Sequence, residues 1–478
     1  MLLKHGAIYL SAKIPPSILG LLSLAIYSRL LGPDEYGHFA ILYSVAGITY
    51  VLFYAWLWFG LVRFIPQFQN REQLLEAVIL RAFILLSLIG GLAGSILALA
   101  WQDDSTRSLV WLAIPLCWLM GWYEINLELL RARLQSAKYT IVSISKSIIT
   151  VLASSTMAYL GLGAEGMVWG LMIGMLLPLA ILFDQSWKKA FHISSNRKIL
   201  IEISHYGLPL TISTLLVMLI FGSDRILIGL LLNPEMAGQY SMANDLALKS
   251  LHTLTIAIDL AAFPLVVHTM SNSDLKTTHS QLLKNSTLLL ALILPAATGL
   301  LVLNESLINL LLDKNYRESA TKIFPWIVLS TFLVGISQAH FQHAFTLGRN
   351  TTLLVKIMMV AYSVNIGLNI LWIPKFGIMG AAYASVCAFS LLLLLSWFYG
   401  RRVFKLPVPW QNIARVLTAS MTMAVVLLSL ERSTSISGLL SQIVLGFVIY
   451  GLLIMILNPD DYRGKFFRKL LELTQQPK

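Results

Sequence analysis

Ionisable side chains lie inside stretches of this sequence that are otherwise apolar, and they are the residues best placed to do chemistry. A charge in the hydrocarbon of a bilayer costs at least about 2.5 kcal/mol near the middle of a helix, so such residues usually face a water-filled cavity or pair with one another. A lysine can bind an anionic group as a point charge. The basic candidates are Lys13, Lys146, Lys249 and Lys356, and the other candidates are Asp224, Arg225, Asp245 and Asp259.

Helical spacing groups several of these residues. Asp245 and His252 share a helix face with Lys249 at spacings of four and three residues, which indicates either a polar stripe lining a lumen or an Asp–Lys pair within one helix. Asp224 and Arg225 are adjacent, so their side chains would diverge by about 100° on a helix. We therefore expect each to find a partner on another helix or in a cavity, as a structural or gating pair rather than in direct contact with a substrate.

The motifs of known enzyme mechanisms are absent from the sequence. It contains no GxxxxGK[ST] phosphate-binding loop, no GxSxG, no HExxH and no Cys/His cluster with metal spacing. His340 and His343 would share a helix face, but without a third ligand this favours a polar interface over a metal site. We expect no enzyme activity, no catalytic residue, no metal and no cofactor, and no ATP-driven transport within this chain.

The composition is that of a membrane protein with many spans. Of 478 residues, 57% are hydrophobic and only 12% are charged, against about 25% charged in soluble domains. The mean hydropathy is +0.74. Cys117 and Cys387 both lie in apolar runs, so no disulfide framework is predicted. The sequence predicts an all-α polytopic membrane protein, in which the placement of the net charge of +12 matters more than its size.

Apolar runs predict the spans, because crossing about 30 Å of hydrocarbon needs about 20 apolar residues. The first run lacks a small-residue cleavage site and is too long for a signal peptide, so we interpret it as a retained helix. The fourteen predicted runs are approximately 6–30, 38–62, 78–101, 108–129, 140–161, 165–184, 206–231, 238–266, 284–303, 321–346, 351–373, 376–399, 410–430 and 437–457.

The basic residues support this count. If the connections alternate between the two sides of the membrane, most Lys and Arg residues outside the helices fall on the side of the N-terminus. Positive charge favours the cytoplasmic side, so both termini are predicted to be cytoplasmic. The largest cytoplasmic connection, 184–205, would divide the chain into halves.

Internal repeats predict a duplication. Leu30–Phe39 recurs as Leu231–Tyr240, and Gly163–Trp169 resembles Gly377–Tyr383. Parallel repeats of this kind imply two six-helix lobes related by an axis along the membrane normal. We expect lobes at 1–190 and 200–400, and two extra helices with a basic cytoplasmic tail at 408–478. Gly32, Pro33 and Gly37, with Pro234 and Gly238 of the second copy, are predicted to shape tight turns on the outer face, one per lobe. Gly377 and Gly380, three residues apart, are predicted to let the backbone turn sharply and to let neighbouring helices approach closely.

The topology leaves two interpretations for three of the lysines. Lys13 precedes Pro15 and Pro16, which should bend the first helix, so it is either a ligand contact at a hinge or a lysine whose ammonium reaches the interface. Lys146 and Lys356 lie near the cytoplasmic ends of equivalent helices in the two lobes. They would either reach the interface or form a basic entrance.

Three segments resemble the signatures of one transporter superfamily. Ser28–Gly37 resembles the helix 1–2 signature of bacterial polysaccharide flippases of the Wzx type. Asp224–Gly229, followed by Pro234–Tyr240, resembles their helix 7–8 signature, and Pro374–Ala382 resembles their helix 11–12 turn. These flippases belong to the multidrug/oligosaccharidyl-lipid/polysaccharide exporter superfamily. Many O-antigen flippases have twelve helices, whereas lipid II flippases and several exopolysaccharide exporters have fourteen, so the substrate stays open.

The resemblance implies a function. A Wzx-type flippase moves an undecaprenyl-diphosphate-linked oligosaccharide from the cytoplasmic to the outer leaflet of the bacterial plasma membrane by alternating access. A basic lumen between the lobes, built from the four lysines, would offset the desolvation of the diphosphate. The resemblance also makes Asp224, Arg225, Asp245 and Asp259 candidates for gating or for coupling to a cation or proton gradient.

Other functions remain as alternatives. A lipid II flippase or a multidrug/cation antiporter belongs to the same superfamily, but intramembrane lysines favour an anionic cargo over a cationic drug. An integral-membrane glycan polymerase or ligase typically needs a sizeable external domain, and the predicted outer loops are short.

The resemblance also implies partners and a location. The expected partners are the lipid-linked oligosaccharide, membrane lipid, a polysaccharide polymerase and a chain-length regulator, with no nucleic acid. The protein would act as a monomer in the bacterial inner membrane, in polysaccharide, O-antigen or lipopolysaccharide biosynthesis.

Overall fold

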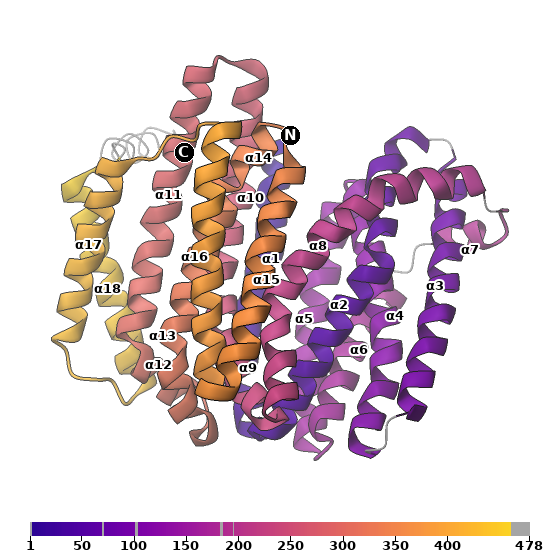
Figure 1. Cartoon of the computed structure of the whole chain (residues 1–478), viewed down its shortest axis with the longest axis horizontal. Coiled ribbons are helices and arrows are strands. Elements are labelled where there is room, and N and C mark those ends of the chain that lie inside the picture. The colour runs from indigo at the N-terminus through magenta and orange to yellow at the C-terminus, as the bar shows by residue number, and fades with distance from the viewer. Residues whose placement is uncertain (1, 69–70, 101–103, 182–184, 195, 460–478) are drawn as a thin grey trace, which may run out of the picture. The chain divides into compact units, whose positions relative to one another are not determined.

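The computed structural model describes residues 2–459, apart from 69–70, 101–103, 182–184 and 195, and the side chains of residues 2–14 and 104–106 are also outside the described set. The described residues are helical nearly throughout, and no strand occurs among them. Figure 1 shows the arrangement of these helices. The elements are α1 (Leu2–Leu30), α2 (Pro33–Phe64), η1 (Ile65–Phe68), α3 (Glu72–Ala100), α4 (Asp104–Ala132), α5 (Ser136–Tyr159), α6 (Gly163–Ile181), α7 (Ser186–Phe191), α8 (Arg197–Leu231), α9 (Pro234–Ala247), η2 (Leu248–His252), α10 (Thr253–Asn272), α11 (Leu275–Val302), α12 (Asn304–Leu311), α13 (Lys314–Ile336), η3 (Ser337–Phe341), α14 (His343–Leu347), α15 (Thr351–Phe376), α16 (Ile378–Val403), α17 (Trp410–Leu428) and α18 (Ile436–Leu457).

The predicted fold class is confirmed. Among the described residues, thirteen helical stretches are long and apolar enough to cross a bilayer. The 29-residue helix α1, whose first side chains are outside the described set, is the further candidate. The protein is therefore an all-α, multi-pass membrane protein.

Several helices extend beyond the apolar runs that predicted them. The run starting at 206 lies in α8, which begins at Arg197, where the side chain of Asn196 accepts a hydrogen bond from the amide of Lys198 at 2.9 Å. Ile199 and Ile203 are buried on one face of this first part of α8. Likewise, α13 begins at Lys314 rather than at 321. Counting apolar residues misses such amphipathic ends, because polar residues occupy their other face.

The chain separates into two compact units. The first comprises 1–242 and 362–381, and the second comprises 243–361 and 382–478. This division runs through α9, α15 and α16. The lobe boundaries expected from the repeat, 1–190 and 200–400, thus remain a prediction.

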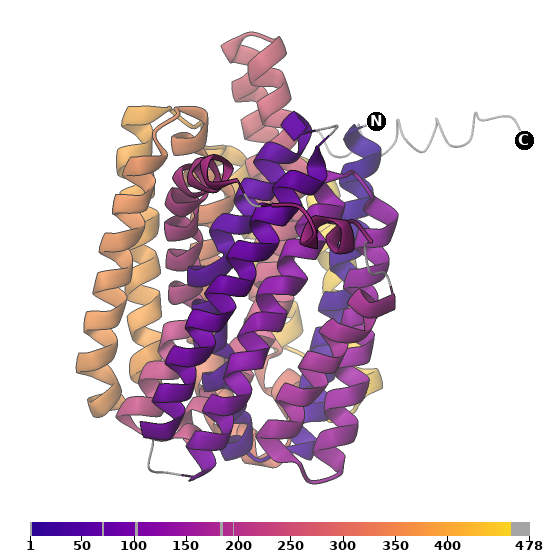
Figure 2. The ribbon, with the colours of Figure 1, turned by 90° about the vertical axis from the view of Figure 1, so that its right-hand side faces the viewer.

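The first unit is built around α2, which packs against α4 and α8. Figure 2 brings its long helices toward the viewer, side by side. Helix α6 carries Gly166, Gly170 and Gly174 along one face, where they pack against α5. A Cβ at Gly170 would lie 2.3 Å from the backbone nitrogen of Ser154, so the two helices meet backbone to backbone.

Tight glycine turns join α5 to α6 and α15 to α16, where the predicted runs 140–161 and 165–184, and 351–373 and 376–399, lie close together in the sequence. Gly161 and Gly163 have φ of +82° and +49° between α5 and α6. Gly377, with φ of +61°, is the single residue between α15 and α16. A residue with a side chain is strained at such positive φ values, whereas glycine adopts them freely.

The second unit contains α17 and α18, which correspond to the two extra helices expected at the C-terminal end. Both helices pack on α11. Tyr450 of α18 donates its hydroxyl to the carbonyl of Ala291 at 2.6 Å. Asn412 of α17 donates its side-chain amide to the hydroxyl of Thr287 at 3.1 Å. These two polar contacts fix the register of the added helices on α11.

Candidate functional site

A cleft of about 550 Å³ opens in the first unit where α2 ends. The chain leaves α2 at Phe64 and enters the short helix η1, which contains Pro66. Residues of α2, η1, α4 and α8 surround the space. They are Trp58, Phe59, Val62, Arg63, Pro66, Glu128, Arg131, Tyr206 and Leu210.

The lining combines two guanidinium groups with one carboxylate and three aromatic rings. The Cζ atom of Arg63 lies 5.9 Å from the ring centroid of Tyr206. Nη1 of Arg131 lies 3.0 Å from Oε1 of Glu128, with the arginine side chain 51% exposed and the glutamate 14%. The surplus positive charge and the fork geometry of guanidinium suit a phosphate group. The rings of Trp58 and Tyr206 add flat apolar surface beside it.

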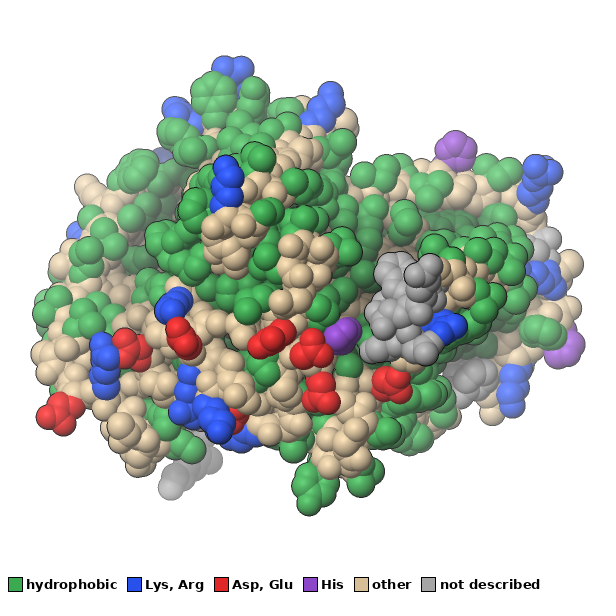
Figure 3. Space-filling model, turned by 60° about the horizontal axis from the view of Figure 1, so that its bottom comes forward, with side chains coloured by type: hydrophobic (Ala, Val, Ile, Leu, Met, Phe, Trp, Pro, Cys, Tyr) green, Lys and Arg blue, Asp and Glu red, His purple; other side chains and the backbone are tan. Residues whose placement is uncertain are grey.

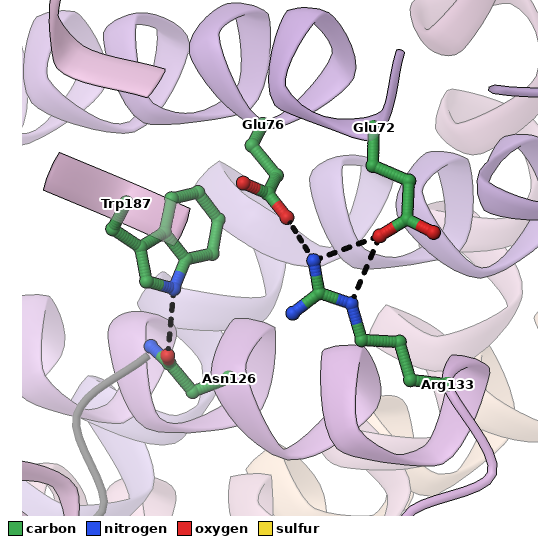
Figure 4. A network of polar contacts seen from close by, with 5 residues as sticks. All are labelled: Glu72, Glu76, Asn126, Arg133 and Trp187. Atoms are coloured by element: carbon green, nitrogen blue, oxygen red, sulfur yellow. Dashed lines mark hydrogen bonds and ion pairs between the residues drawn. The ribbon is translucent and has the colours of Figure 1, made fainter. Parts of the chain in front are cut away.

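A polar network braces the end of α4 that carries this site, as Figure 4 shows. Arg133 donates from Nε and Nη2 to Oε2 of Glu72 of α3 at 3.0 and 2.8 Å, and from Nη2 to Oε1 of Glu76 at 2.5 Å. Trp187 of the short helix α7 is buried and donates its indole N–H to Asn126 at 3.0 Å. Together, α3 and α7 hold the C-terminal end of α4, and so the positions of Glu128 and Arg131.

Asp224 lies at the centre of a second buried network in the first unit. Its Oδ2 accepts a hydrogen bond from the hydroxyl of Tyr240 at 2.8 Å, and its Oδ1 accepts one from the side-chain amide of Asn369 at 2.8 Å. Nδ2 of Asn369 also lies 3.1 Å from Oδ1 of Asn365. Asp224 and Arg225 are both buried. The carboxylate on α8 therefore has its hydrogen-bond partners on two other helices, α9 and α15, as expected.

The four lysines of the predicted basic lumen are differently placed. Lys13 lies outside the residues whose side chains the structure describes. In the first unit, Nζ of Lys146 lies 4.8 Å from the ring centroid of Tyr123, and the lysine is half-buried. In the second unit, Lys249 is half-buried on η2 and Lys356 is exposed on α15. The basic lumen remains a prediction.

The remaining acidic candidates lie in irregular surroundings. Asp245 is half-buried on α9, and the π turn η2 begins three residues later, so the regular spacing assumed for Asp245, Lys249 and His252 does not hold there. Asp259 contacts His343, a partner 84 residues away in the sequence, with a distance of 2.7 Å between Oδ1 and Nε2. Spacing within one helix carries no signal for such a contact, so sequence reasoning missed it.

The repeated motif has a structural role that the sequence showed only in part. A Cβ at Gly37 would lie 1.8 Å from the carbonyl oxygen of Pro234, and one at Gly238 would lie 1.8 Å from that of Pro33. The two copies, expected as separate turns with one in each lobe, thus pack reciprocally within the first unit. At Gly32 a Cβ would meet nothing within 4 Å.

Two other features of the motifs are seen in the structure. A Cβ at Gly380 would lie 2.3 Å from the carbonyl oxygen of Trp372, which holds the start of α16 close to the end of α15. The acidic residues Asp34, Glu35 and Glu235 of the repeated motif are exposed. Figure 3 turns the lower end of the molecule toward the viewer and shows acidic side chains, with basic ones among them, on this face.

Residues 26–321, more than half of the chain, match the family described as "Polysaccharide biosynthesis protein". The chain belongs to this family. It is also 22% identical, over 95% of each sequence, to a protein of Haloferax volcanii named a probable low-salt glycan biosynthesis flippase.

Solved structures share the fold. The lipid II flippase MurJ, in an inward closed conformation, has a TM-score of 0.74 at 17% identity and covers 97% of this chain and 100% of its own. An inward-facing multidrug resistance transporter of the MATE family has a TM-score of 0.59 at 15% identity, with 83% and 98% covered. At these identities the likeness shows a shared fold. The match to the polysaccharide biosynthesis family confirms the resemblance that the three motifs carry.

Proposed function

We propose that this protein is a flippase that moves an undecaprenyl-diphosphate-linked oligosaccharide from the cytoplasmic to the outer leaflet of a bacterial plasma membrane. Membership of the polysaccharide biosynthesis family and the flippase fold support the class of function. The observation that carries the choice of cargo is the cleft in which Arg63 and Arg131 stand beside Trp58 and Tyr206.

The cargo chemistry matches this lining. A diphosphate ester carries about two negative charges at neutral pH and needs compensating charge when it leaves water. Two guanidinium groups on neighbouring helices can each offer paired N–H donors to its oxygens. The aromatic rings offer faces against which the C–H faces of sugar rings can pack. Glu128, bonded to Arg131, moderates the charge so that the cargo can also leave.

The predicted topology gives this cleft a place in the transport cycle. The distribution of basic residues puts the connection after Arg63 and the connection after Arg131 on the cytoplasmic side, with both termini. The cleft would then receive the head group from the leaflet where it is made. The basic lumen of Lys13, Lys146, Lys249 and Lys356 and the coupling candidates Asp224, Arg225, Asp245 and Asp259 belong to the same proposal, as later steps of transport by alternating access.

Lipid II is the alternative cargo, because the likeness to MurJ extends over nearly the whole of both chains. It shares the diphosphate chemistry, so the cleft accommodates either lipid. A cationic drug fits less well, because the cleft lining carries surplus positive charge. A polysaccharide polymerase, a chain-length regulator and monomeric action remain part of the proposal, in polysaccharide or O-antigen biosynthesis.

A binding measurement tests the cleft. Purified full-length protein in nanodiscs is titrated with undecaprenyl diphosphate, and bound lipid is measured by native mass spectrometry. Loss of a charged hydrogen bond costs about 1.5–3 kcal/mol, so Arg63→Ala is expected to weaken binding about ten-fold or more. Arg71→Ala is the matched control, because Arg71 is exposed, follows shortly after η1 and does not line the cleft. Equal affinity of Arg63→Ala and wild type would refute the cleft as the head-group site.

A further inference from the structure

The short helix α7 lies between two membrane spans of the first unit. Helix α6 ends at Ile181 and α7 begins at Ser186, so a fully extended chain between these two residues spans at most about 17 Å. Helix α8, which contains the next span, begins at Arg197. Figure 1 shows α7 beside α3, at the edge of this unit. Its place in the chain therefore puts α7 close to the surface of the bilayer.

One face of α7 is anchored in the protein. Trp187 and Ala190 are buried, and the ring centroid of Trp187 lies 4.8 Å from that of Trp122 of α4. The indole N–H donates to Oδ1 of Asn126 at 3.0 Å, and the side-chain amide of Asn126 donates to the carbonyl of Trp122 at 2.8 Å. Helix α7 is thus attached to α4 just before Glu128, which lines the cleft.

The other face of α7 places positive charge around an exposed aromatic ring. Lys188 and Lys189 are exposed, and Phe191 is 64% exposed. The beginning of α8 adds Arg197 and Lys198, which are also exposed. An aromatic ring is poorly accommodated in water, but it is stable at the boundary between lipid headgroups and acyl chains, where basic residues commonly flank it.

The charge of this segment is of one sign. The sequence from 185 to 201 contains these four basic residues and no aspartate or glutamate. Ile201, which is 47% exposed, continues the apolar surface of Phe191 in the sequence, and Glu202 is the next acidic residue. Four or more basic residues on or beside an amphipathic helix that adjoins a membrane span are typical of a site for anionic lipid headgroups. The exposed apolar residues favour a lipid over a soluble acidic partner.

We propose that α7 and the first turn of α8 bind the headgroups of anionic phospholipids in the bilayer that holds the protein. The lysines and Arg197 attract the lipid phosphates, and Phe191 enters the boundary between headgroups and acyl chains. A bound lipid holds α7 at the membrane surface, and the hydrogen bond of Trp187 to Asn126 restrains α4 and its cleft residues. This last step rests on the proposed function, whereas the lipid site does not.

Native mass spectrometry of the full chain tests the lipid site. The protein is released from nanodiscs that hold equal amounts of phosphatidylglycerol, which is anionic, and phosphatidylcholine, which is zwitterionic, and the retained lipids are identified. The wild type should retain phosphatidylglycerol selectively. Its affinity for this lipid should fall about ten-fold or more in Lys188→Gln combined with Lys189→Gln, because each basic residue near an anionic surface adds to the attraction.

The matched control is Lys138→Gln combined with Lys276→Gln. It removes the same charge at two exposed lysines that are far apart in the sequence. This control should retain phosphatidylglycerol as the wild type does. Equal retention of the two lipids by the wild type, or an equal loss of selectivity in both double variants, overturns the lipid site.

The second arm measures the binding of undecaprenyl diphosphate in nanodiscs with and without phosphatidylglycerol. Coupling between two sites typically changes affinity at least about five-fold, so the wild type should bind undecaprenyl diphosphate that much more tightly when phosphatidylglycerol is present. Trp187→Phe removes the indole donor and should abolish this dependence while phosphatidylglycerol is still retained.

The outcomes of the second arm separate the two proposals. No dependence on phosphatidylglycerol in the wild type, or an equal dependence in Trp187→Phe, overturns the link from α7 to α4. A chain that binds no undecaprenyl diphosphate, but loses phosphatidylglycerol when Lys188 and Lys189 are replaced, supports the lipid site and refutes the proposed function instead.

Discussion

Asp224 shows how one residue can serve several helices. Both carboxylate oxygens accept hydrogen bonds, one from Tyr240 of α9 and one from Asn369 of α15. The adjacency of Asp224 and Arg225 predicted partners on other helices, because neighbouring side chains diverge. The identity of these partners could not be predicted, since Asn369 lies 145 residues away.

Removing this carboxylate should destabilise the first unit. Asp224→Ala leaves a buried hydroxyl and a buried amide without their acceptor, at about 1–3 kcal/mol for each unsatisfied group. The thermal unfolding midpoint in detergent should fall, and by less in Asp224→Asn, which keeps one acceptor oxygen. Asp34→Ala, at a side chain 63% exposed, is the control and should unfold near the wild-type temperature. Identical midpoints for Asp224→Ala and wild type would exclude this structural role.

The lysines mark the limit of what residue types alone can predict. An ionisable residue within an apolar run indicates a functional site, but its spacing in the sequence does not show where its side chain points. Lys356 is exposed, and Lys146 lies over the ring of Tyr123. Lys249 lies on a π turn, which the sequence pattern did not predict. Arg63 and Arg131 both line the cleft, although each lies just beyond the end of a predicted apolar run.

At the scale of elements, sequence reasoning found the helices but not their contacts. Apolar runs located the spans because the bilayer demands continuous apolar length. The charged amphipathic ends of helices, such as the first part of α8, were not predicted, because an apolar run ends at the first cluster of polar residues. The repeat around Gly37 was recognised, yet similarity between two segments shows only that they fold alike. It carries no information that Gly37 would pack on Pro234.

The reciprocal glycine contact should tolerate no side chain. In Gly37→Ala the new Cβ would lie 1.8 Å from a backbone oxygen, which cannot rotate away. Overpacking of this kind typically costs about 1–3 kcal/mol, so the yield of folded protein and its unfolding midpoint should both fall. Gly47→Ala tests the same exchange on α2 at a position where a Cβ meets nothing within 4 Å. If both variants unfold at the same temperature, the close approach of α2 and α9 is not present in the protein.

At the scale of the whole molecule, composition and repeats sufficed for the class of fold. The sequence predicted a polytopic transporter from its low charged fraction, its fourteen apolar runs and its three motifs. The family match and the fold shared with MurJ agree with this prediction. The two compact units, however, divide inside helices rather than at the connection 184–205. Sequence repeats follow duplication, whereas compact units follow side-chain packing, so the two need not coincide.

The predicted basic lumen is testable on the intact protein. Lys249→Ala and Lys13→Ala should each lower the rate of glycan transport while insertion into the membrane stays normal, because each removes a positive charge available to the diphosphate. Lys322→Ala is the control, since Lys322 pairs with Glu318 at an exposed site. Wild-type transport by both lumen variants would rule the lumen out and leave the cleft at Arg63 as the basic site.

The central claim is that the chain carries a lipid-linked oligosaccharide across a bilayer. The most direct measurement reconstitutes the full chain in liposomes with labelled undecaprenyl-diphosphate oligosaccharide in the inner leaflet, and follows its appearance outside by cleavage with an added glycosidase. Parallel vesicles hold lipid II or a cationic dye. We predict cleavage well above that in protein-free vesicles, reduced by Arg63→Ala and unchanged by Arg71→Ala. Movement of lipid II or the dye, with the oligosaccharide lipid remaining protected, would contradict the account.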